Sequence, residues 1–157
     1  MKKRIVGLVY LFPFLTGGIY FIYWILSLVY EINQYFNGEK IKFKLLLVNF
    51  IITLIAYLSL LSIIILLNRD NKLFFLLFFI CFALAIYWFY LIISTLLKIV
   101  KYVFIIQEME SIEPKINKEF CLVMFIIYFI GIIILQNSIN KIAMKQNVKK
   151  EEEKYGT

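Results

Sequence analysis

Residues 45–67, LLLVNFIITLIAYLSLLSIIILL, decide the fold, because 23 consecutive residues contain no charged side chain. A helix of about 20 predominantly apolar residues crosses the roughly 30 Å hydrocarbon core of a bilayer. A helix also satisfies all its own backbone hydrogen bonds, which a chain surrounded by lipid requires. We therefore predict that residues 45–67 form a transmembrane helix.

Similar apolar runs lie on both sides of this stretch. The chain of 157 residues is 63% hydrophobic and only 17% charged, whereas soluble domains are about half apolar and a quarter charged. The pattern predicts an all-α, polytopic transmembrane bundle, a single domain over residues 1–147, before a disordered charged tail at 148–157. We expect four spans, in the apolar segments 5–30, 45–67, 73–97 and 120–136. Amphipathic surface extensions are expected at 31–36, 98–113 and 137–147.

The first apolar segment, residues 5–30, is interrupted by Pro13 and the pair Gly17-Gly18. Proline removes a backbone donor and paired glycines loosen a helix, so the sequence predicts either a kinked span or a re-entrant hairpin. We favour the kinked span. We also favour an uncleaved segment over a signal peptide, because the apolar run continues well beyond the small residues.

Two groups of side chains predict how the spans pack and where the bilayer ends. Small or weakly polar residues at spacings of three and four share one helical face, which is typical of a helix–helix contact; a substrate path is the alternative. These residues are Asn49, Thr53, Ala56 and Ser59. Aromatic residues with polar tips prefer the headgroup level, so Tyr87, Trp88 and Tyr90 predict an interface belt.

The net charge of +7 comes from lysines and arginines that flank the apolar runs. This distribution favours anionic lipid headgroups, and not nucleic acid, as the partner of the positive charge. With four spans, the positive-inside rule places both termini in the cytoplasm. With a re-entrant first segment, the N-terminus stays inside and the C-terminus lies outside.

The stretch TGGIYFIYW, residues 16–24, carries Thr16, Gly17, Gly18, Tyr20, Tyr23 and Trp24 in a distinctive spacing. It resembles the opening signature of a family of small bacterial membrane proteins known as domain of unknown function 4234. Asn33 resembles the asparagine that follows that signature, and Gln136 and Asn140 resemble the closing pattern of the family. The resemblance implies a multi-pass protein of the bacterial cytoplasmic membrane, but no activity. From the residues alone, anchoring and packing are the favoured roles, with a ligand pocket around the glycines as the alternative.

Chemistry-bearing residues are sparse. The chain has no histidine, no charged residue inside an apolar run, and two cysteines, Cys81 and Cys121, outside any CxxC motif. We therefore predict no catalytic, metal-binding or cofactor-binding residues, and we interpret Glu108, Glu110 and Glu113 as a solvated helix end. The predicted function is a non-catalytic scaffold, subunit or regulator that contacts itself or another membrane protein. The alternative is an oligomeric channel or passive carrier built around the broken first segment.

Overall fold

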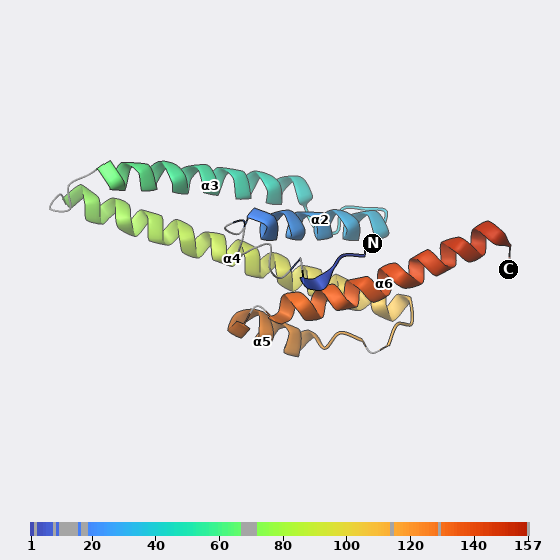
Figure 1. The fold of residues 1–157 in the computed structure, drawn as a ribbon. Coiled ribbons are helices and arrows are strands. Elements are labelled where there is room, and N and C mark those ends of the chain that lie inside the picture. The colour runs from blue at the N-terminus through green and yellow to red at the C-terminus, as the bar shows by residue number, and fades with distance from the viewer. Residues whose placement is uncertain are drawn as a thin grey trace. The chain divides into compact units, whose positions relative to one another are not determined.

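The computed structural model describes residues 1, 3–7, 9, 16, 19–66, 72–113, 115–128 and 130–156, and each element assigned there is an α-helix. The helices are α2 (Ile19–Tyr35), α3 (Phe43–Leu66), α4 (Lys72–Met109), α5 (Lys118–Tyr128) and α6 (Ile130–Tyr155) (Figure 1). Where the sequence predicts one domain, the chain forms two compact units. Unit 1 comprises Met1–Ile41 and Leu96–Thr157, and unit 2 comprises Lys42–Thr95.

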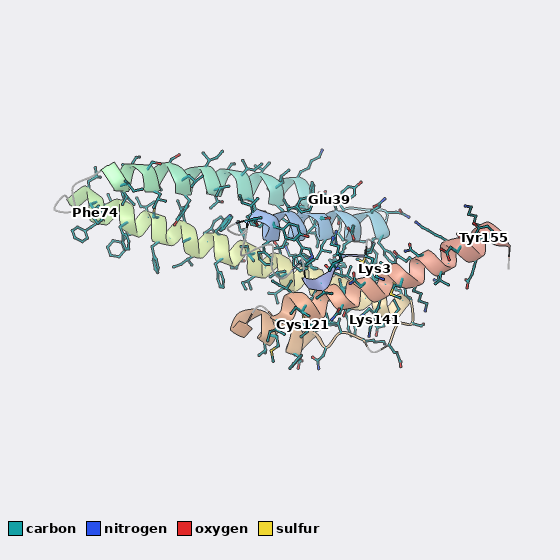
Figure 2. The ribbon with its side chains drawn as sticks, viewed as in Figure 1. Lys3, Glu39, Phe74, Cys121, Lys141 and Tyr155 are labelled. Atoms are coloured by element: carbon teal, nitrogen blue, oxygen red, sulfur yellow. The ribbon has the colours of Figure 1, made fainter. Side chains whose placement is uncertain are left out.

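Unit 2 consists of α3 and the first part of α4. The stretches Phe43–Ile65 and Leu73–Met109 are long and apolar enough to cross a membrane, yet only 11% and 6% of their most apolar windows are buried. Large apolar side chains project from all around both helices (Figure 2). The core helix of a soluble domain buries such side chains, so these two helices are candidate membrane spans.

The predicted packing face of α3 is buried only in part. Thr53 is buried, Asn49 and Ala56 are half-buried, and Ser59 is exposed. The hydroxyls of Thr53 and Ser59 donate to carbonyls four residues earlier in their own helix, at 2.5 and 2.8 Å. The exposure of Ser59 corrects the prediction, because the large ring of Phe50 makes the aromatic contact between α3 and α4.

The three residues of the predicted interface belt differ in their surroundings. Tyr87 and Tyr90 are exposed. Trp88 is half-buried and packs edge-on against Phe50, with 6.0 Å between ring centroids. Two of the three aromatic side chains are therefore free to reach a headgroup region, and the third joins the helices of unit 2.

Unit 1 has a well-packed apolar core built from α2, the end of α4 and α6. The largest completely buried side chains of these helices are Trp24, Ile25, Leu28, Ile32, Ile99, Ile106, Leu135, Ile139 and Ile142. Lys98, Lys101 and Lys141 lie on the exposed sides of the same helices. The stretches that the sequence predicts as amphipathic extensions therefore pack in unit 1 with their apolar faces inward.

The apolar segment 120–136, which we predict to be one span, is divided between two helices. Helix α5 ends at Tyr128, α6 begins at Ile130, and the two pack against each other as a hairpin (Figure 1). The Cys121 thiol lies 3.5 Å from the carbonyl oxygen of Gly131, and both residues are buried. The prediction of a single crossing helix here is corrected, because the chain folds back where glycine permits close approach.

The predicted disordered tail is also corrected, because α6 continues to Tyr155. The Lys149 amino group donates to the Glu110 carboxylate at 2.6 Å, which ties this part of α6 to the end of α4. The helix then ends at Gly156, whose φ of 67° is the left-handed conformation common at helix C-termini.

Candidate functional site

The two ends of the first apolar segment meet in unit 1. The Arg4 guanidinium forms an ion pair with the Glu31 carboxylate and donates to the Ser27 hydroxyl at 2.7 Å. Their side chains are only 15% and 6% exposed. A continuous helix over residues 5–30 would separate its ends by about 39 Å. The contact therefore differs from the predicted kinked span and matches the re-entrant alternative, while Pro13, Gly17 and Gly18 lie outside the described residues.

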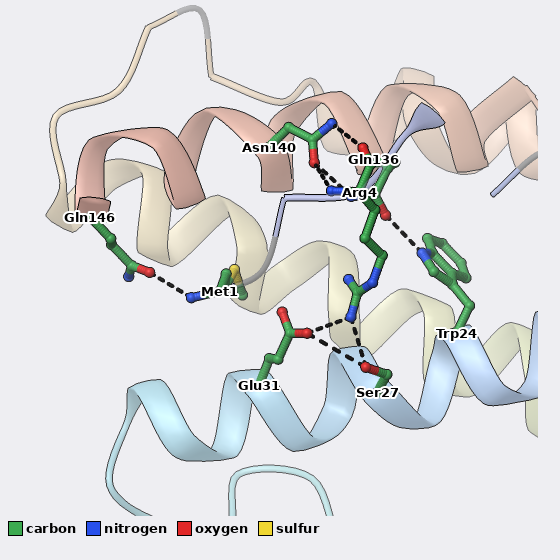
Figure 3. Close-up of polar contacts among 8 residues, drawn as sticks. All are labelled: Met1, Arg4, Trp24, Ser27, Glu31, Gln136, Asn140 and Gln146. Carbon is green, nitrogen blue, oxygen red and sulfur yellow. Dashed lines mark hydrogen bonds and ion pairs between the residues drawn. The ribbon is translucent and has the colours of Figure 1, made fainter. Parts of the chain in front are cut away.

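A chain of hydrogen bonds joins residues that are far apart in the sequence (Figure 3). The Trp24 indole N–H donates to Gln136 Oε1 at 2.8 Å, and Gln136 Nε2 donates to Asn140 Oδ1 at 2.9 Å. Asn140 in turn bonds both backbone groups of Arg4, at 2.9 and 2.8 Å. Three residues of the family-like motif therefore converge, and each of their amide or indole groups is used to hold the hairpin against α6.

The other residues of the motif cap or decorate α2. Thr16 Oγ1 accepts from the Tyr20 backbone N–H at 3.1 Å, near the start of the helix. The rings of Tyr20 and Tyr23 lie 6.0 Å apart between centroids, and Tyr23 is exposed. These positions are compatible with capping and anchoring, and they lie apart from the hydrogen bonds of Gln136.

Asn33 fixes the connection that leaves α2. Its amide donates to the Ile41 carbonyl at 2.7 Å and accepts from the backbone N–H groups of Lys40 and Ile41 at 2.9 Å each. Helix α2 ends here in a Schellman motif with Asn37 in the left-handed conformation, at φ 49°. Asn33 is therefore a clamp for the turn between α2 and α3.

Substituting Asn33 with Ala should lower the free energy of unfolding by about 1–3 kcal/mol, because three backbone groups of the turn lose their partner. Thermal unfolding in detergent micelles measures the change. The neighbouring Gln34→Ala, at an exposed position, is the matched control and should have little effect. Equal effects of the two substitutions would remove Asn33 from this role.

A second polar cluster surrounds Glu110, just after the end of α4. The Tyr35 hydroxyl donates to its carboxylate at 2.9 Å, and Lys145 donates to its backbone carbonyl. The hydrogen bond from Lys149 lowers the pKa of Glu110, whereas burial, with the bond to Glu110, raises the pKa of Tyr35 to about 12. This glutamate, which we interpreted as solvated, instead joins α2, α4 and α6.

Acid should release the last turns of α6. Because the pKa of Glu110 is lowered from 4.5 in the folded chain, its contribution is complete above that value and is lost as the pH falls below it. We expect amide hydrogen exchange in residues 145–155 to accelerate on acidification from about pH 5 to about pH 3. In Glu110→Gln the exchange should already be fast at pH 5. An unchanged acid response in that variant would assign the effect to another carboxylate.

Arg4, Ser27, Glu31 and Gln107 are the polar residues of unit 1 that the sequence interpretation missed. Gln107 is completely buried and accepts from the Ile116 backbone N–H at 2.7 Å. Arg4 Nη1 and Gln107 Nε2 are buried and find no hydrogen-bond partner in the part of the chain that the structure describes. The available signal was that Arg4 and Glu31, of opposite charge, bracket the uncharged segment 5–30.

The arrangement holds helices together and shows no reactive centre in the described residues. Cys81 and Cys121 are both free thiols and lie in different units. No group of three histidine, cysteine, aspartate or glutamate side chains converges within the described ranges. Comparisons of the chain with models of protein families, with curated proteins and with solved structures find no match.

Proposed function

We propose that the protein is a non-catalytic scaffold of the bacterial cytoplasmic membrane, in which α3 and α4 cross the bilayer. The first and last apolar segments enter the bilayer as re-entrant hairpins and do not cross it. The observation that carries this proposal is the ion pair between Arg4 and Glu31, because it brings both ends of residues 5–30 together. The convergence of Trp24, Gln136 and Asn140 supports membership of the domain of unknown function 4234 family as part of the proposal.

Helix lengths support two crossings. Helix α3 has 24 residues and is about 36 Å long, enough for the roughly 30 Å hydrocarbon core. From Ile19 to Glu31, α2 rises only about 18 Å before its first charge, and α5, with 11 residues, is about 16 Å long. Each hairpin limb therefore reaches about halfway through a bilayer.

The charge distribution supports the same topology. Of the 17 lysines and arginines, all except Arg69 and Lys72 lie outside the connection between α3 and α4 and its immediate neighbours. Two crossings place these two residues on one side of the membrane and all the others on the opposite side. Four crossings would divide them ten to seven. The positive-inside rule therefore favours two crossings with both termini in the cytoplasm.

The polar side chains favour a scaffold over a channel. The guanidinium of Arg4, which could attract an anion at the broken first segment, is paired with Glu31 and Ser27. Gln136 and Asn140 are likewise used to join α6 to the N-terminal segment. We propose anionic headgroups as partners of the lysines, and a second copy or another membrane protein as the partner of the scaffold.

Reconstitution tests the scaffold against the channel. We expect purified protein in vesicles of phosphatidylethanolamine and phosphatidylglycerol to release no more trapped ions or dye than empty vesicles do. In mild detergent the protein should purify with a defined membrane partner or as a homo-oligomer. Release that rises with protein content would contradict the scaffold and favour the channel.

A further inference from the structure

We infer that this protein wedges open the cytoplasmic leaflet and bends the membrane so that this leaflet is convex. The inference rests on the proposed function and adds an activity to it. It depends on three limbs of unit 1 that are too short to cross, namely the first half of α2, α5 and the first two turns of α6.

The short limbs carry exposed apolar side chains. Ile19 at the start of α2 is 73% exposed, Phe120 on α5 is 51% exposed, and Ile130 at the start of α6 is 38% exposed. The core of unit 1 leaves these side chains uncovered. Contiguous exposed apolar surface is costly in water, so lipid is the medium that these ends of the helices fit.

The limbs enter from the same side. Helices α2 and α6 run in the same direction, because Trp24 bonds Gln136 and, further along both helices, Tyr35 and Lys149 both bond Glu110. Their apolar starts therefore lie at one end of unit 1 and their charged ends at the other. Helix α5 runs back along α6, so its start at Lys118 also lies toward the polar end.

The result is an unequal cross-section in the two leaflets. A helix about 10 Å across occupies roughly 80 Å² of a leaflet. The two crossing helices take about 160 Å² from each leaflet, and the three short limbs add about 240 Å² to the cytoplasmic leaflet alone. Shallow apolar insertion into one leaflet is coupled to membrane curvature. A protein that occupies over twice the area in one leaflet therefore acts as a wedge.

Vesicle size tests the wedge. The full-length protein is reconstituted at increasing protein-to-lipid ratios into vesicles of phosphatidylethanolamine and phosphatidylglycerol, and diameters are measured by electron cryomicroscopy. We expect the mean diameter to fall by about a factor of two over the series, with the termini on the convex outer surface. An unchanged diameter, at an incorporation verified by flotation, would overturn the inference.

Two variants separate insertion from folding. Ile19→Lys combined with Ile130→Lys places charge at the exposed tips and should abolish most of the size change. The matched control Val148→Lys, at a residue 52% exposed near the polar end of α6, should bend vesicles as the natural chain does. Circular dichroism verifies that each variant is folded. Loss of bending in both variants, or in neither, would contradict insertion of the tips.

Protease accessibility in the same vesicles keeps this inference distinct from the proposed function. If both termini lie on one side and the connection between α3 and α4 on the other, the two crossings hold, whatever the diameter. If the termini lie on opposite sides, the proposed topology fails and the wedge fails with it. An unchanged diameter with correct topology overturns only the wedge.

Discussion

Replacing Glu31 with Gln should lower the free energy of unfolding by about 3–5 kcal/mol, because the guanidinium of Arg4 then stays buried without its counter-charge. The pair is almost fully shielded from solvent, which makes its loss more costly than that of a surface ion pair. Denaturant unfolding in micelles, followed by Trp24 fluorescence, measures the change.

A double-mutant cycle attributes this loss to the pair. Arg4→Gln combined with Glu31→Gln should be less destabilised than the sum of the single variants, because neither charge is then left alone. The exposed Glu39→Gln is the control and should have little effect. Additive losses from the two single variants would mean that the residues do not interact across the segment.

Trp24→Ala should cost about 3–5 kcal/mol of unfolding free energy, because the indole is among the largest fully buried side chains and leaves a cavity. Gln136→Leu should cost about 1–3 kcal/mol by leaving the indole N–H buried without an acceptor. Trp24→Phe with Gln136→Leu removes both partners and should cost less than the two separate changes together. Thermal unfolding in detergent measures all four variants.

The neighbouring Tyr23→Ala is the control for the tryptophan. Tyr23 is 63% exposed on the same helix, so its truncation removes little protein packing. If Tyr23→Ala were as destabilising as Trp24→Ala, the helix would be buried on a different face.

Local pattern was sufficient to predict α3 and α4. Both contain more than 20 consecutive residues without charge, and such a run has few other stable solutions. The family resemblance also identified Trp24, Gln136 and Asn140, which the structure brings together. Their partners could not be read from spacing, because they lie over 100 residues apart.

The two hairpins and the tail depend on non-local contacts. A broken apolar segment looks the same in sequence whether its halves continue or fold back, and only the pairing of Arg4 with Glu31 distinguishes them. In the same way, a lysine- and glutamate-rich tail is typical of disorder, yet Lys149 finds Glu110 on another helix. Long-range partners therefore account for the differences between the prediction and the structure.

Cysteine labelling in whole cells tests the two-crossing topology most directly. In a background with Cys81 and Cys121 replaced by Ala, a single cysteine is placed at Glu39, Asp70 or Glu113, one in each connection between apolar segments. With two crossings, a membrane-impermeant maleimide should label only Asp70→Cys from outside the cell, and the other two only after lysis. Labelling of Glu39→Cys and Glu113→Cys from outside, with Asp70→Cys protected, would contradict this account and restore four crossings.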